Sequence, residues 1–258
     1  MPKRYRSEEH ELTGEYEHSI EPRHGAHRAG SPGGTCSRFP SRHFMVEDAS
    51  CGADNLEIDG FNTFTHARCP WASTAPCRCG RHSLHIDSLI VAVDGACPGN
   101  GTPHATKSAG GVFFARGSPE NLAFRVADKP GYPHTSQRAE LSAAIVAIKI
   151  SEKYVYNGGQ WDCEDCPTPC AVAHLVIKSD SAYLVNGMTA HVEKWRQNGW
   201  RTAKGTEVKN RDLWTKLDNR VCSLYDDTGV AIDFWLVPRD QNREADNLAN
   251  FGLEIPGK

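Results

Sequence analysis

The sequence predicts an α/β fold in which helices flank one mixed β-sheet. Three short apolar runs, rich in residues that favour strands, follow one another within residues 89–126. A long helix with one apolar face comes next, and strand and helix patterns then alternate toward the end of the chain. The resulting order, βββαβαβα with helical insertions, indicates a mixed sheet with helices on its faces.

The first three predicted strands cover residues 89–93, 111–114 and 122–126, with a Gly-Ser-Pro turn between the last two. Three strands in a row suggest an antiparallel meander. The first of them runs into a carboxylate, Asp94, and then into a glycine-rich turn. Because a lone buried carboxylate loses solvation free energy, Asp94 needs a partner, and a metal ion is the simplest one.

The first predicted helix begins at Ser136, whose hydroxyl can cap it. Its buried face consists of Leu141, Ala144, Ile145 and Ile148, which recur at the i, i+3, i+4, i+7 spacing. The later elements are a strand at 175–178, a short helix at 181–187, helical pieces at 194–200 and 211–220, a strand at 231–237 and a closing helix at 242–251.

Composition divides the 258 residues into one main domain and an N-terminal extension. Residues 1–50 combine Gly, Ser, Pro, His and charge without an apolar period, so we expect them to be largely disordered. Residues 51–85 are rich in Cys, His, Pro and Trp with no clear strand or helix; they form either a metal-stapled appendage or a loop packed on the main domain. Residues 86–254 form the main domain, with a Cys-containing insertion at 156–172.

Hydropathy and charge limit the cellular locations and the binding partners that we expect for the protein. No apolar run approaches the length needed to span a membrane, and residues 1–30 lack the apolar core of a signal peptide. We therefore expect an intracellular protein, nuclear or cytoplasmic, whose ten cysteines are thiols or metal ligands. The formal net charge is -3, yet basic residues crowd segment 194–216. No feature indicates an obligate protein partner, and we expect a monomer.

Four short motifs follow one another at suitable spacing in the main domain. They are Asp94-Gly95-Ala96 with Gly99-Asn100-Gly101, Thr135-Ser136-Gln137-Arg138-Ala139-Glu140, Ser179-Asp180-Ser181 and Glu244-Ala245-Asp246. Together they resemble the ordered signatures of the type 1 ribonuclease H family, although each alone is a weak signal. The resemblance covers about residues 86–254. It implies a ribonuclease H-like fold with a five-stranded mixed sheet, its first three strands antiparallel, flanked by helices.

The resemblance implies that four carboxylates converge as metal ligands and catalytic residues: Asp94, Glu140, Asp180 and Asp246. Without a cation, acids crowded together repel one another and their pKa values rise. Two Mg²⁺ ions about 3.5–4 Å apart, with Mn²⁺ as an alternative, would turn the cluster into a clamp for phosphodiester hydrolysis. One ion would activate the attacking water and the other would stabilise the leaving 3′ oxygen. For any single acid, a solvated surface position is the alternative.

An RNA–DNA hybrid is the substrate that the resemblance implies. Gly95, Asn100 and Gln137 are expected to face the RNA strand and its 2′-hydroxyl groups in the minor groove. Thr135 and Asn210 match positions that hold a DNA phosphate. Recognition of backbone and hydroxyl groups is independent of sequence.

Segment 192–211 resembles the basic protrusion with which cellular members of the family grip the DNA strand. Its basic groups would attract phosphates, while Trp195 and Trp200 would offer flat surfaces to sugar and base. For Trp195, a position in the core is an equally open alternative.

Two departures from the family pattern concern turnover and DNA binding. Cellular members commonly carry a histidine loop before the last aspartate, whereas the connection at 237–246 is short and has no histidine. Arg239 or Arg243 could contact the scissile phosphate in its place. Pro133 stands where the phosphate pocket usually has an arginine, so a weaker grip on DNA is expected.

The insertion contains Cys163, Cys166 and Cys170, and His174 follows on the adjoining strand. A Cys-x-x-Cys pair is a common half of a tetrahedral Zn²⁺ site, which needs four ligands. A second cluster comprises Cys69, Cys77, Cys79 and His82, and the two clusters could share one ion. Free or partly buried thiols are the alternative.

We therefore predict a metal-dependent endoribonuclease that cuts the RNA strand of RNA–DNA hybrids and leaves 5′-phosphate and 3′-hydroxyl ends. The presence of all four acids favours this enzyme. A nucleic-acid-binding or scaffold protein on the same fold, with weak or no turnover, is the alternative, and the missing histidine loop keeps it open.

Overall fold

One mixed sheet organises the computed structural model, which describes residues 37–39, 57–61, 63–68, 84–156, 172 and 174–256. Its strands are β1 (Ser37–Phe39), β2 (Glu57–Phe61), β3 (Phe64–Arg68), β4 (Leu84–Ala96), β5 (Ala109–Phe113), β6 (Leu122–Arg125), β7 (His174–Ser179) and β8 (Ala231–Leu236). Its helices are α1 (Ser136–Tyr156), α2 (Ala182–Asn186), the π-helix η2 (Gly187–His191), α3 (Val192–Gln197), α4 (Arg211–Thr228), the 3-10 helix η3 (Arg239–Gln241) and α5 (Arg243–Gly252).

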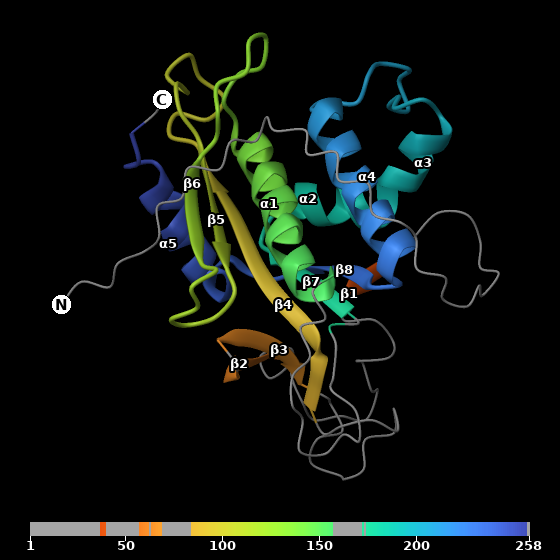
Figure 1. Cartoon of the computed structure of the whole chain (residues 1–258). Coiled ribbons are helices and arrows are strands. Elements are labelled where there is room, and N and C mark those ends of the chain that lie inside the picture. The colour runs from red at the N-terminus through yellow and green to blue at the C-terminus, as the bar shows by residue number, and fades with distance from the viewer. Residues whose placement is uncertain are drawn as a thin grey trace.

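Strand β4 is the centre of the sheet, and it confirms the predicted topology. The carboxyl-terminal half of β4 pairs antiparallel with β5, which pairs antiparallel with β6. On the other side, β4 pairs parallel with β7, and β7 pairs parallel with β8. These five strands form the predicted mixed sheet, whose first three strands are antiparallel (Figure 1).

Three further strands enlarge the sheet beyond the sequence prediction. Strand β3 pairs antiparallel with β2 and with the first half of β4, within a segment where no strand was predicted. Phe64 fastens β3 to the core because its ring packs edge-on against Phe114 and Tyr154, at centroid distances of 5.8 and 4.7 Å. Strand β1 pairs parallel with β8, inside the stretch expected to be disordered. The rest of residues 1–50 lies outside the described residues.

Helices cover both faces of the sheet (Figure 1). The four apolar residues predicted for the first helix are all buried in α1, which packs on β4 and also on α4. On the opposite face, α5 packs against β5 and β4. None of the helices within these ranges is long and apolar enough to cross a lipid bilayer.

Candidate active site

Two neighbouring residues of β4 face different helices and bring them together at one point. Gly95 packs against α1: a Cβ added to it would lie 2.3 Å from the backbone nitrogen of Glu140. Asp94 pairs with Gly111, where an added Cβ would lie 2.3 Å from the carbonyl oxygen of Ala245 in α5. Only glycine permits such close approaches. Asp94 therefore lies where β4, α1 and α5 meet.

Asp180 is the next acid of the site, and it directly follows β7. Its Oδ1 accepts a hydrogen bond of 2.9 Å from Nδ2 of Asn242, and the same nitrogen donates to the carbonyl oxygen of Val93 at 3.0 Å. Asn242 thus joins the ends of β7 and β4. The next residue, Ser181, donates its hydroxyl hydrogen to Oε2 of Glu140. The segment that follows β7 is therefore bonded to the Glu140 carboxylate of α1.

Asp246 lies in the first turn of α5 and is held by two exposed side chains. Its Oδ1 is 2.8 Å from Nη2 of Arg239, and its Oδ2 accepts a hydrogen bond of 3.1 Å from Nδ2 of Asn250. The Arg239 side chain is 77% exposed. All four predicted acids therefore lie on the predicted elements, but Asp246 is fixed by surface contacts.

The electrostatic environment shows that the acids influence one another. Burial, followed by the nearby charge of Asp180, raises the pKa of Asp94 to about 7, against the hydrogen bond from the Gly95 backbone. The charges of Asp246 and Glu140 raise it further. The pKa of Glu140 is also raised, mainly by burial. The hydrogen bond from Ser181 opposes this shift. Crowded carboxylates in a partly dry site favour a bound cation.

The chemistry of the donors fits a hard divalent cation, because all four side chains offer carboxylate oxygens. Within the described ranges, however, no group of three or more His, Cys, Asp or Glu side chains is already arranged to hold a metal ion. Neighbouring side chains occupy some of the carboxylate oxygens; they are Ser181, Asn242 and Arg239. A cation at these oxygens would therefore compete with the contacts that they already make.

Of the residues expected to face RNA, Asn100 lies at the start of α1. Its Nδ2 donates to Oγ of Ser136 at 3.0 Å, while its Oδ1 accepts from the Ser136 backbone at 3.1 Å. Gln137 is half-buried, and its Oε1 has no hydrogen-bond partner. Gly95 packs against α1, as described above. These three residues therefore surround the helix start that also carries Glu140.

The two residues expected to hold a DNA phosphate are brought together by Arg138. Oγ1 of Thr135 accepts from the Arg138 backbone at 3.2 Å, and Oδ1 of Asn210 accepts from the Arg138 guanidinium at 3.4 Å. The same guanidinium makes two 2.9 Å bonds to Asp212. Asn210 adopts a left-handed conformation, with φ of 60°, at the start of α4. The group lies at the junction of α1 and α4.

The two predicted aromatic contacts differ in exposure. Trp195 is half-buried and packs against Trp214, with ring centroids 5.3 Å apart, so the core position left open for it is largely realised. Trp200 is only 8% exposed and belongs to the core, which differs from the flat exposed surface that was expected. Its backbone has φ of 63°, which directs the chain sharply after α3. Packing in the core therefore explains the position of the Trp200 side chain.

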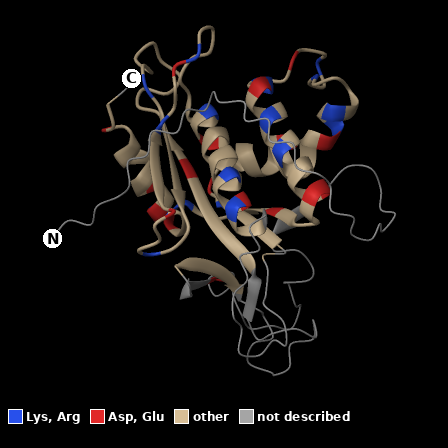
Figure 2. Ribbon diagram, in the orientation of Figure 1, with Lys and Arg blue, Asp and Glu red and all other residues tan. Residues whose placement is uncertain are grey.

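Basic residues recur along α3, α4 and the loop between them, with acidic residues among them (Figure 2). Two of the basic side chains form ion pairs within this region: Arg196 with Asp218 and Arg211 with Glu207. The remaining positive charge of the predicted protrusion is exposed and available for phosphate contacts; it comes from Lys194, Arg201, Lys204 and Lys209.

The predicted zinc ligands Cys163, Cys166 and Cys170 lie outside the described residues, as do Cys69, Cys77, Cys79 and His82. His174 is described, and both of its ring nitrogens have partners. Nδ1 lies 2.9 Å from Oγ of Ser88, and Nε2 lies 3.1 Å from Oδ2 of Asp233. Both ring nitrogens of His174 therefore contact side chains of neighbouring strands. The zinc sites stay a prediction.

Sequence analysis missed Asn242, which is 1% exposed and bonded to Asp180. A signal was present, because an Asn at the start of a helix predicts a cap. The Asn242 side chain makes no capping bond in α5 and reaches the neighbouring strand ends instead. Its role becomes visible only when the start of α5 is placed against the ends of β4 and β7.

Comparison with known proteins defines the class. The family model described as RNase H matches residues 87–254, and the chain belongs to this family, of type 1. The chain is 32% identical over 172 residues to Ribonuclease H1 of Mus musculus, covering 65% of this chain and 51% of the mouse protein. It is 34% identical over 174 residues to Ribonuclease H of Alcanivorax borkumensis, covering 66% of this chain and 93% of the bacterial protein.

The chain thus spans about half the length of the mouse relative and nearly all of the bacterial one. Among solved structures, RNase H1 from the halophilic archaeon Halobacterium salinarum is similar, with 21% identity and a TM-score of 0.39. That match covers 65% of this chain and 98% of the archaeal chain.

Proposed function

We propose that the protein is an endoribonuclease that hydrolyses the RNA strand of RNA–DNA hybrids and leaves 5′-phosphate and 3′-hydroxyl ends. The observation that supports this most directly is the raised pKa of Asp94, which results from burial and from three nearby carboxylates. Such a cluster destabilises the fold unless it serves a cation. Relatives named Ribonuclease H, together with the matching family model, support the reaction class.

The four acids, Asp94, Glu140, Asp180 and Asp246, are the residues that would hold two Mg²⁺ ions, or Mn²⁺ as an alternative. When bound, such ions would activate water and stabilise the leaving oxygen. The surrounding side chains determine how the acids are oriented. Asn242 fixes one oxygen of Asp180 at 2.9 Å, which leaves its second oxygen for the cation side.

Substrate binding is proposed for two regions on either side of this cluster. Asn100, Gln137 and Gly95, at the start of α1, would contact the RNA strand. The partnerless Oε1 of Gln137 is an acceptor suited to a 2′-hydroxyl donor. Thr135 and Asn210, together with the basic loop between α3 and α4, would contact the DNA strand. The exposed part of the Trp195 side chain would also contact the DNA strand. The Trp200 ring lies beside it, with centroids 6.3 Å apart.

Arg239 is the residue that we propose to contact the scissile phosphate in place of the histidine loop. Its guanidinium lies on Asp246 and is mostly exposed, so it can turn toward an arriving phosphate. Arg243 is also exposed and is the first residue of α5. A bidentate guanidinium at this edge would orient the phosphate but could not transfer protons as histidine does.

The discriminating experiment incubates an end-labelled RNA–DNA hybrid with the full chain and Mg²⁺ or Mn²⁺. Wild type should cleave only the RNA strand, and Asp180→Asn should not, because one carboxylate ligand is lost while the hydrogen bond from Asn242 can be kept. A matched control is Asp240→Asn, an exposed acid in η3 outside the cluster. Intact RNA with wild type across metal and salt conditions would refute the proposal.

The alternative is a hybrid-binding protein with weak or no turnover. The Arg239–Asp246 ion pair favours it, since a guanidinium already occupies one of the four acids. A gel-shift titration distinguishes the two. Hybrid binding by wild type without any cleavage, even with Mn²⁺, would support the binding protein.

A further inference from the structure

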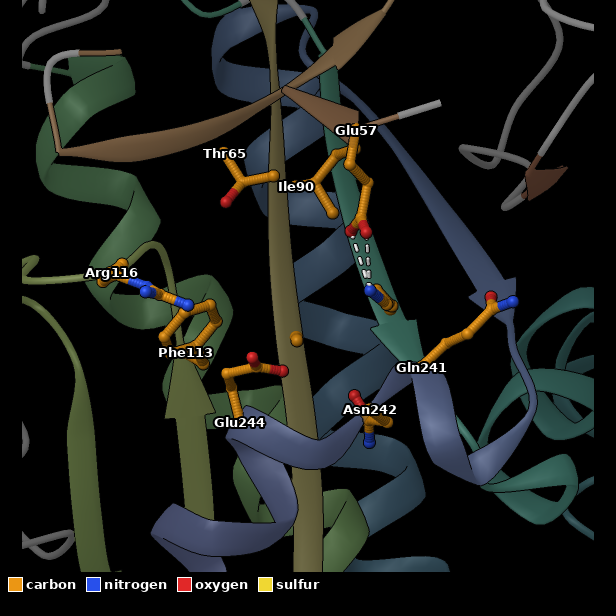
Figure 3. Close-up of a pocket in the computed structure, with 10 residues that line it drawn as sticks. Glu57, Thr65, Ile90, Phe113, Arg116, Gln241, Asn242 and Glu244 are labelled. Carbon is orange, nitrogen blue, oxygen red and sulfur yellow. Dashed lines mark hydrogen bonds and ion pairs between the residues drawn. The ribbon is translucent and has the colours of Figure 1, made fainter. Parts of the chain in front are cut away.

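A pocket adjoins the acid cluster on the α5 side of the sheet. It has a volume of about 120 Å³ and is lined by strands β2 to β5, β7 and the η3–α5 connection (Figure 3). The apolar part of its wall consists of Ile90, Ala92 and Phe113. Its polar part consists of Glu57, Thr65, Arg116, Lys178, Gln241, Asn242 and Glu244. The pocket is therefore large enough for a small molecule and mostly polar.

Asn242 separates this pocket from the acid cluster. Its Nδ2 is directed away from the pocket, to Asp180 and Val93. Its Oδ1 has no hydrogen-bond partner, although the residue is only 1% exposed, and the oxygen points into the pocket (Figure 3). A buried amide oxygen without a donor is unfavourable. A donor in the pocket, whether a water or an N–H group of a ligand, would satisfy this oxygen.

The charges around the pocket define the occupant further. Two cations line the pocket, Lys178 and Arg116. Lys178 is paired with Glu57, because its Nζ lies 2.8 Å from both carboxylate oxygens. The Glu244 carboxylate faces the same space as Oδ1 of Asn242 (Figure 3), and it forms no ion pair with any residue in the described ranges. An amide oxygen and an unpaired carboxylate together form an acceptor pair suited to N–H donors with positive charge.

We propose that this pocket binds a small organic cation that carries N–H donors, of the guanidinium or primary ammonium class. One N–H would donate to Oδ1 of Asn242 and another to Glu244. The carbon part would lie against Phe113 and Ile90. A guanidinium fits better than an alkali ion because its planar fork can reach both acceptors at once.

Calorimetric titration of the full chain with methylguanidinium chloride tests the proposal in the presence of a chelator, so that the acid cluster holds no metal. Wild type should show saturable one-to-one binding in the millimolar range. Glu244→Gln should weaken it about tenfold, since the charge is lost but the shape is kept. Ala92→Leu, which fills the pocket from β4, should abolish binding. Thermal melts followed by circular dichroism establish that both variants are folded.

Acetamide and acetate serve as neutral and anionic probes of similar size. Equal binding of acetamide, binding of acetate instead, or water alone in the pocket with no saturable heat would each overturn the proposal. Unchanged methylguanidinium affinity in the folded Glu244→Gln variant would also overturn it. Since no nucleic acid or metal takes part, the result is independent of the proposed hydrolysis.

Discussion

The two halves of the acid cluster are held in different ways. Asp94 and Glu140 are positioned by backbone packing, because Gly95 presses β4 against α1 and Asp94 is 8% exposed. Asp246, in contrast, is held at the surface by Arg239. The buried half is therefore fixed when the core forms. The exposed half can rearrange without disturbing the core.

Stability and function conflict in the buried half of the cluster but not in the exposed half. The buried half keeps a carboxylate in a site that disfavours its charge, so it should lower the stability of the protein. The exposed half should contribute little to stability and mostly to chemistry. Substitutions in the two halves should therefore differ in kind, with large changes in unfolding free energy on one side and small ones on the other.

The largest effect is expected from pH acting on Asp94. Its folded pKa, about 7, lies above its ordinary value of 3.8, so the folded protein binds the extra proton between these values. The contribution of Asp94 to the free energy of unfolding should therefore be greatest below about pH 4 and be lost as pH rises from 4 to 7, a fall of about 4 kcal/mol at most. Urea denaturation at several pH values, with chelator, measures this fall.

Asp94→Asn is the control for this pH dependence. The variant should be more stable than wild type at pH 8 and less different from it at pH 4. Parallel profiles for the two proteins would show that Asp94 is not the group responsible.

Gly95→Ala should give the next largest effect. The added methyl group would lie 2.3 Å from the Glu140 backbone, which no rotamer change can relieve. We expect a loss of about 3 kcal/mol in unfolding free energy by urea denaturation, at the upper end for overpacking. Gly117→Ala is the comparison, since its Cβ would meet open space and only its φ of 79° is unfavourable. That variant should lose about 1 kcal/mol. Equal losses would contradict the close approach.

Asn242→Ala should cost somewhat less, about 2 kcal/mol, because it removes hydrogen bonds to a carboxylate and to a buried carbonyl. The effect should also reach the acid cluster, since Asp180 loses its hydrogen-bond partner. Denaturation measures the stability, and hybrid cleavage by the folded fraction measures the consequence for Asp180. Asn250→Ala, which removes an exposed bond to Asp246, is the matched control. Equal destabilisation by both changes would argue against a special role for Asn242.

The same contrast explains what the sequence could and could not predict. The five central strands and α1 were predictable because each carries its own apolar period, as in Leu141 and Ile148. Strands β2 and β3 were not, since their stability depends on pairing with β4 and on the single aromatic anchor Phe64. Within the site, the acids follow from motifs. The tertiary partners do not, because Asn242 and Asp180 meet only in the folded chain.

Trp200 was predicted to be an exposed contact for nucleic acid, but it lies in the core. An aromatic residue inside a charged segment has no local signal that separates an exposed contact from a core position. Its backbone is left-handed, with φ of 63°, which is unusual for a bulky residue, and its side chain is buried. The charge pattern of the sequence therefore predicted the basic segment, but it did not predict whether its tryptophan side chains are exposed or buried.

The smallest change in stability is expected for Arg239→Ala, which tests the exposed half directly. Because the ion pair with Asp246 is mostly solvated, unfolding free energy should change by less than about 0.5 kcal/mol. Hybrid cleavage should respond much more if Arg239 contacts the scissile phosphate, with a lower kcat and a nearly unchanged KM. Arg243→Ala carries the same change of charge four residues along. A fall in kcat with Arg243→Ala but not with Arg239→Ala would move the phosphate contact to α5, and equal rates for both variants and wild type would remove arginine from the reaction altogether.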